Sequence, residues 1–235
     1  MSNSPLVNFT HYSPHHSGKK VYPITRITPH HVVGLASVEA LGKEFDGTRE
    51  ASSNYGIGPD GRIGLYVDEC NRAWTSGSYD NDNRAVTIEC ADYPTYPYEF
   101  PDVVYQRLIE LCVDICKRYG KTKLLWFGDK EKTLSYQPAD DEMVLTVHRW
   151  LASTACPGEW LMEHMADLAE QVTAKLHVND NTPAGWAKEA VEWATSNGLL
   201  AGDNRGDLML RSPITREQFC VVLKRYHDLF NSKNG

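Results

Sequence analysis

Short stretches in which apolar and polar residues alternate, or which are apolar throughout, recur along the first part of the chain between glycines and prolines. This pattern is typical of short β-strands, because successive side chains of a strand point to opposite faces of a sheet. The predicted strands span residues 27–34, 55–58, 62–67, 86–91 and 124–127. Together they would supply one central sheet.

Two longer stretches carry apolar residues at helical spacing. The first begins near Pro101, which suits the first position of a helix, and stops near Gly120; the second spans residues 159–176. The apolar positions are Val104, Leu108, Leu111 and Ile115 in the first, and Leu161, Met165, Leu168, Val172 and Leu176 in the second. Strands interspersed with such helices predict an α/β domain in which helices cover a sheet.

The pattern changes after the second helix. Residues 177–183 are polar and include a proline, which is typical of a linker. We therefore expect a first domain over residues 1–176 and a small second one over residues 184–235.

The second domain is expected to be a helix–loop–helix of about fifty residues. Trp186 and Trp193 stand on one helical stripe, and Thr215 with Gln218 forms a capping box that would start another helix at Arg216. This domain would be small and helical.

The composition is that of an ordinary globular protein, with 235 residues, 41% of them apolar and 23% charged. A net charge of −7 argues against a nucleic-acid partner, because affinity for phosphates comes mainly from clustered lysine and arginine. Nothing near Met1 looks like a signal peptide, and no apolar run could cross a membrane. The expectation is a cytosolic product whose six cysteines are reduced, one of them available to a metal.

Three side chains of metal-ligand type lie in segments that could converge: His30 near the end of a predicted strand, and His148 and Cys156 further along. Zinc accepts imidazole nitrogen and thiolate, and a catalytic site keeps three protein ligands and one open position. His148 and Cys156 would need a loop that folds back, which Pro157 and Gly158 permit. Spacing alone leaves unrelated roles for these residues open.

In four segments the chain resembles the type 2 N-acetylmuramoyl-L-alanine amidases, the family related to phage lysozyme-like amidases and peptidoglycan recognition proteins. These segments are the strand with the His30–His31 pair and residues 52–63, 83–89 and 148–158. The resemblance implies a central mixed β-sheet flanked by helices, a Zn²⁺ cofactor and bacterial peptidoglycan as substrate.

The resemblance also implies roles for individual residues. His30, His148 and Cys156 would be the zinc ligands, and Glu89 the general base. His31 is the alternative to His30, but adjacent strand residues face opposite sides and the family pattern favours the first.

Thr154 matches a position that faces the reacting carbonyl in these relatives; an ordinary loop threonine is the alternative. Many relatives carry a catalytic tyrosine before the Asp-Gly turn, and that place here falls on Ser53. Tyr55 is the alternative, but it matches a packing aromatic better. Asn54, Trp74 and Asn83 suit either a groove for glycan and stem peptide or ordinary loops.

The second domain looks like a single S-layer-homology motif, through residues 183–193, 198–202 and 214–217. Such motifs usually come in threes and bind secondary cell-wall polysaccharide. One copy buries little core, so this one could anchor weakly, pack on the first domain or form a homo-oligomer. Trp186 and Arg216 would contact the polymer or another copy; a core aromatic and a helix-start cation are the alternatives.

The function that the resemblance implies is hydrolysis of the amide bond between N-acetylmuramic acid and L-alanine. Without a signal peptide, the enzyme would resemble a phage endolysin that waits in the host cytoplasm and reaches the wall after release. A bacterial autolysin or recycling amidase is an alternative. A non-catalytic peptidoglycan-binding protein is another, although those relatives generally lose the cysteine ligand.

Overall fold

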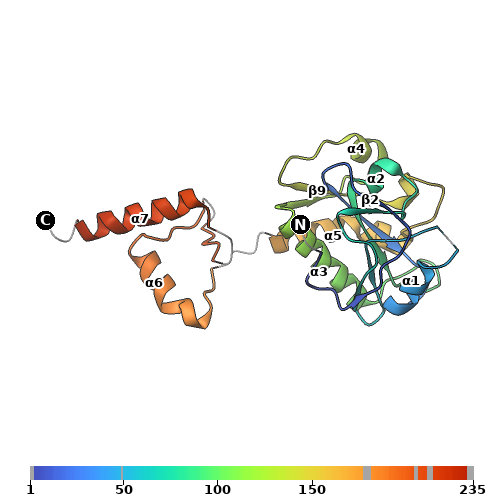
Figure 1. Ribbon diagram of the computed structural model, residues 1–235, viewed down its shortest axis with the longest axis horizontal. Coiled ribbons are helices and arrows are strands. Elements are labelled where there is room, and N and C mark those ends of the chain that lie inside the picture. Colours follow the sequence, from blue (N-terminus) through green and yellow to red (C-terminus); the bar gives the residue numbers. More distant parts are fainter. Residues whose placement is uncertain (1–2, 49, 177–180, 204–205, 211–213, 232–235) are drawn as a thin grey trace. The chain divides into compact units, whose positions relative to one another are not determined.

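The computed structural model describes all residues except 1–2, 49, 177–180, 204–205, 211–213 and 232–235 (Figure 1). The chain divides into two compact units, Met1–His177 and Val178–Gly235. Most of the expected linker, residues 177–183, lies outside the described residues. None of the described helices combines the length and apolar character that a membrane span requires.

The first unit is built on a seven-stranded sheet in the order β1-β5-β4-β7-β3-β9-β8. All neighbouring strands are parallel except β4 and β5, so the sheet is mixed. The strands are β1 (Phe9–Thr10), β3 (Arg26–His31), β4 (Tyr55–Ile57), β5 (Ile63–Leu65), β7 (Ala85–Cys90), β8 (Lys123–Leu125) and β9 (Glu142–Leu145). A small second sheet pairs β2 (His16–Lys19) with β6 (Asn71–Ala73).

Two long helices, α3 (Asp102–Arg118) and α5 (Glu159–Leu176), pack against each other and share one apolar core with the sheet. Shorter helices are α1 (Val38–Glu44), α2 (Tyr79–Asp82) and α4 (Lys130–Ser135). The predicted α/β fold, a mixed sheet flanked by helices, is thus confirmed. One detail is corrected: Pro101 is the residue before α3 rather than its first residue, because its backbone is extended (ψ 142°).

The two faces of the sheet differ in chemistry because side chains alternate along each strand. On β3, Ile27 belongs to the apolar core, whereas the hydroxyl of Thr28 lies 2.7 Å from that of Thr146. On β7, Ile88 faces the core, and Thr87 bonds to the loop that holds Asn54. The second face is therefore polar, and it is the face that His30 and Glu89 share with these threonines.

The second unit holds a 3₁₀ turn, η2 (Gly185–Ala187), and two helices, α6 (Lys188–Ser196) and α7 (Arg216–Asn231). The predicted capping box is present: the Gln218 N–H donates to the Thr215 hydroxyl at 3.1 Å, and the Thr215 N–H donates to the Gln218 side chain at 2.8 Å. Among the described residues of this unit, Leu199 is the single large apolar side chain that is buried. The unit thus has almost no core of its own.

Candidate metal centre and active site

The candidate site lies where the parallel strands β7, β3 and β9 end. His30 on β3 is paired directly with Glu89 on β7, and His148 and Cys156 follow β9. Parallel strands bring their carboxyl ends to one edge of the sheet, and ligand sites of α/β proteins form there. Residues far apart in sequence meet for this reason.

His30, His148 and Cys156 offer ligand atoms that all lie within 4.8 Å of one another. The Cys156 Sγ atom is 3.3 Å from His30 Nδ1, and the rings of His30 and His148 meet edge to face with centroids 4.9 Å apart. His30 is 1% exposed and Cys156 7% exposed. The three donors thus form one compact, largely buried group.

Burial sets the charge state of this group. Desolvation, followed by the neighbouring His148 and His31, lowers the pKa of His30 well below its usual value. Desolvation, followed by the carboxylate of Glu89, raises the pKa of the Cys156 thiol. Without a cation both groups are therefore neutral near pH 7, and a bound divalent ion would favour the thiolate.

The donor set fits zinc. Donors around a tetrahedral zinc lie about 3.5 Å apart, given bond lengths of about 2.0–2.3 Å. The Cys156 Sγ to His30 Nδ1 distance of 3.3 Å is close to this, and all three donors lie within 4.8 Å of one another. His30 Nε2 is also buried without a hydrogen-bond partner among the described residues. A buried imidazole whose Nδ1 atom lies next to a thiol, with a second imidazole beside it, suits a metal ligand better than a core histidine.

Glu89 lies at the border of this group. Its Oε1 atom is 3.9 Å from His30 Nδ1, and its side chain is 17% exposed. Its carboxylate is not among the three grouped donors. A carboxylate so placed can reach a water molecule near the metal and still meet solvent.

The loop that carries Cys156 is held by several contacts. The Arg149 N–H donates to the Cys156 carbonyl at 3.0 Å, and the Arg149 guanidinium donates to the Ala155 carbonyl at 2.6 Å. Gly158 has φ +86°, and a Cβ there would lie 3.1 Å from His31 Nδ1, so the close turn requires glycine. The exposed Thr154 accepts the Cys156 N–H at 3.2 Å, which leaves its own hydroxyl proton free to donate.

His31 is not part of the donor group. Its Nδ1 lies 2.9 Å from the fully buried carboxylate of Asp92, and its ring packs edge to face on Tyr98. Asp92 also accepts the Gly34 N–H. The His31–Asp92 pair therefore stabilises the edge of the sheet beside the group of His30, His148 and Cys156 donors, which we call the metal group.

Of the three residues predicted to contact substrate, Asn54 and Asn83 are enclosed within the domain. Asn54 is fully buried, and its amide donates to backbone carbonyls of Val67 and Asp68. Asn83 is 2% exposed and donates to the Tyr79 carbonyl, while the Trp74 indole donates to Ser17. Asn54 and Asn83 precede β4 and β7, at the amino ends of these strands, so neither amide is available to a ligand in the groove that we expected.

The two residues considered in place of a catalytic tyrosine are equally enclosed. The Ser53 hydroxyl donates to Thr87 at 3.3 Å, and the Tyr55 hydroxyl donates to the buried carboxylate of Glu69 at 2.6 Å. Both side chains are fully buried. Both hydroxyls are therefore engaged within the domain.

Aromatic side chains that the sequence analysis did not consider lie at the edge of the sheet that carries the His30, His148 and Cys156 donors. Tyr93 and Tyr96, in the loop after β7, are 44% and 76% exposed. On the other side, Trp126 after β8 stacks on Trp150 after β9, with ring centroids 4.9 Å apart and planes 4° apart. Flat rings on both sides of the metal group could hold a sugar or peptide. Their position in the sequence, directly after predicted strands, is the feature that would have indicated this edge of the sheet.

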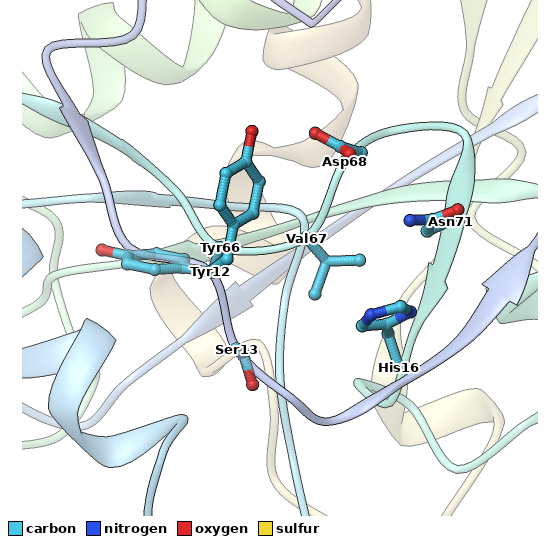
Figure 2. Close-up of a pocket in the computed structure, with 7 residues that line it drawn as sticks. All are labelled: Tyr12, Ser13, His16, Tyr66, Val67, Asp68 and Asn71. Carbon is cyan, nitrogen blue, oxygen red and sulfur yellow. The ribbon is translucent and has the colours of Figure 1, made fainter.

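A separate cavity of about 350 Å³ lies beside the end of β5, and Figure 2 shows the side chains around it. It is lined by Tyr12, Ser13, His16, Tyr66, Val67, Asp68 and Asn71. The Ser13 and Tyr66 hydroxyls donate to backbone carbonyls, and Asp68 accepts the Asn3 amide. Because β5 is antiparallel to β4, this cavity is at the edge of the sheet opposite His30, and its polar groups are largely used internally.

Comparisons with known proteins agree with this geometry. Residues 20–159 match the family Amidase_2, described as N-acetylmuramoyl-L-alanine amidase. Similar solved structures include PlyL (13% identity, 70% of this chain and 95% of that chain, TM-score 0.51) and the hydrolase AmiA of Staphylococcus aureus (14%, 74% and 84%, 0.53). These two likenesses concern the fold alone. A search of curated proteins finds no match. The matched residues include His30, Glu89, His148 and Cys156.

Proposed function

This chain belongs to the N-acetylmuramoyl-L-alanine amidase family, and from that membership we propose that it is a zinc-dependent hydrolase of bacterial peptidoglycan. The bond cut is the amide between the lactyl group of N-acetylmuramic acid and L-alanine. The observation that carries the proposal is the group of His30, His148 and Cys156 donors within 4.8 Å, with Glu89 beside it.

His30, His148 and Cys156 would hold the ion. Zinc bound there would lower the pKa of a water molecule toward about 7 and polarise the amide carbonyl. Glu89 accepts the proton of the attacking water and returns it to the departing amine. The Thr154 hydroxyl donates a hydrogen bond to the carbonyl oxygen as its negative charge grows. The C–N bond breaks to leave a lactyl carboxylate and a free alanine amine.

Within this function we propose the role of a phage endolysin, which reaches the wall from the cytoplasm of the host. A bacterial autolysin or recycling amidase would use the same chemistry. A non-catalytic peptidoglycan-binding protein is the third candidate. The retained Cys156, buried next to His30, favours hydrolysis over binding alone.

For the second unit, residues 184–235, we propose an S-layer-homology-like module that holds the enzyme on secondary cell-wall polysaccharide or assembles copies of it. Trp186 is 92% exposed, which argues against a core role within this unit. Arg216 is exposed at the start of α7. Both side chains are accessible to a partner.

The product of the reaction tests the proposed function. Incubation of purified cell walls with the protein is expected to release new N-terminal alanine without new reducing sugar, because an amide and not a glycosidic bond is cut. Dinitrophenylation of free amines measures the new N-terminal alanine, and a reducing-sugar assay on the same samples measures new glycan ends. New reducing ends without free alanine would show a glycosidase instead.

Removal of the second unit separates catalysis from attachment. A chain that ends at Leu176 is expected to hydrolyse soluble muropeptides at a rate within about threefold of the full chain, because the first unit has its own apolar core. Its retention on sedimented walls, or the number of chains per particle in solution, should fall. If neither changes while the truncated chain stays folded, both roles proposed for the second unit lose support.

A further inference from the structure

One side of α7 carries a regular row of large apolar side chains. Phe219, Leu223, Tyr226 and Phe230 are separated by four, three and four residues, and they are 53%, 50%, 46% and 46% exposed. This is the spacing of the seam by which one helix packs against another. We call these four residues the α7 stripe.

The stripe is distinct from the side of α7 that meets its own unit. A groove of about 580 Å³ separates the loop after α6 from α7, and its α7 lining includes Gln218, Val221, Val222 and Arg225. At 100° per residue, the centre of this lining lies about 140° around the helix from the stripe. Within the described part of the second unit, nothing buries the stripe.

The rest of the second unit cannot compensate for this exposure. Five further large apolar side chains of the unit are exposed beside the four of the stripe, and Leu199 is the single buried one among its described residues. Small domains that bury little apolar surface gain stability from an additional device, and oligomerisation is one such device. The stripe is therefore the surface that a partner would cover.

The first unit offers no matching surface on its long helices. The exposed positions of α3 and α5 are mostly charged, including Glu110, Glu163 and Glu170, and Val103 is their one large exposed apolar residue.

The net charge of the second unit also favours a second copy of this chain as the partner. Residues 178–235 hold seven basic and seven acidic residues and are neutral, whereas residues 1–177 hold 17 and 24 and carry the whole net charge of −7. Self-association through the second unit meets no net repulsion there, and neutrality gives an anionic polymer no general attraction.

We propose that the α7 stripe is a self-association surface, which packs against the same stripe of a second copy of this chain. A two-fold symmetric dimer suits a single stripe, because both copies use the same surface in such an interface. A helix of 16 residues is about 24 Å long, so the pair buries less than the roughly 800 Å² per partner of a typical stable interface. Association should thus depend on concentration. This inference is independent of the amidase activity.

The test measures the mass of the full chain in solution across protein concentrations from about 1 to 500 μM, around the micromolar range of weak interfaces. All samples carry Cys220→Ser, because this exposed cysteine on α7 could otherwise form a disulfide between copies. We expect a rise to at least twice the mass of one chain. Leu223→Asp, in the middle of the stripe, should keep the chain monomeric throughout, because pairing would bury two carboxylates against apolar groups.

A matched control puts the same acidic residue outside the stripe. Lys224→Asp lies about 130° around α7 from the centre of the stripe and should associate like the parent chain. Circular dichroism shows whether each variant keeps its helices, and hydrolysis of soluble muropeptides shows that the first unit is folded. A parent chain that stays monomeric would overturn the proposal and indicate that another partner covers the stripe. An oligomer that survives Leu223→Asp would overturn it too.

Discussion

Replacement of Cys156 by alanine is expected to leave the protein folded but without bound zinc, and to reduce amide hydrolysis by roughly a thousandfold or more. Loss of an outer partner of a metal ligand already costs about 10–100-fold, and Cys156 is one of only three grouped donors. Its thiolate is also the one anionic ligand of the set. Zinc content after dialysis, with the rate of alanine release on the same sample, measures both effects.

The control for this change is Cys70→Ala, which removes an exposed thiol outside the donor group. That variant should keep its zinc and its rate. If Cys156→Ala bound zinc as well as the parent chain, or if a metal-free preparation stayed active, the proposed metal centre would be wrong.

Side-chain pattern was enough to predict the strands at the centre of the sheet. Central strands such as β3 and β7 bury alternate side chains in the α3–α5 core, and burial selects apolar residues at every second position. The strands β1, β2 and β6 were missed because they are short and mostly exposed or half-buried. Backbone hydrogen bonds to a neighbouring strand form such strands, so their side chains need not follow a recognisable pattern. The inner strand β9 has four residues and begins with an acidic one, too little for a periodic signal.

The candidate site was harder to predict than the sheet. His30 and Cys156 are 126 residues apart, and their contact depends on β3 and β9 being neighbours in the sheet. Sequence spacing does not contain strand order, so the grouping of these residues rested on a family resemblance. The grouping agrees with the structure, whereas the catalytic roles remain proposals.

The positions of the expected substrate contacts depend on strand direction as well. Asn54 and Asn83 lie near aromatic residues in sequence, but each precedes a strand whose other end carries the site. The direction of a strand decides whether a polar loop lies at the edge of the sheet that carries the metal group. The residue pattern does not reveal that direction. The exposed tyrosines after β7 and the Trp126–Trp150 stack lie at the same edge as His30 because they follow their strands.

Glu89→Gln is expected to lower kcat for amide hydrolysis by about 10²–10⁴-fold, the usual contribution of a general acid–base group, while zinc content and thermal stability stay unchanged. Glutamine keeps the shape of the side chain but cannot accept and return a proton. Zinc should remain because the Glu89 carboxylate is not among the three grouped donors. Single-turnover rates on a soluble muropeptide, zinc analysis and thermal unfolding on one preparation give the three values.

Glu99→Gln is the matched control, because Glu99 is an exposed carboxylate in the loop that follows the same strand. It should hydrolyse the muropeptide like the parent chain. A Glu89→Gln enzyme that kept more than about a tenth of the parent rate would exclude Glu89 as the general base. Loss of zinc together with activity would instead make Glu89 a fourth ligand, and the open position needed for water would then be filled. Only loss of rate with retained metal fits a carboxylate that moves protons beside the centre.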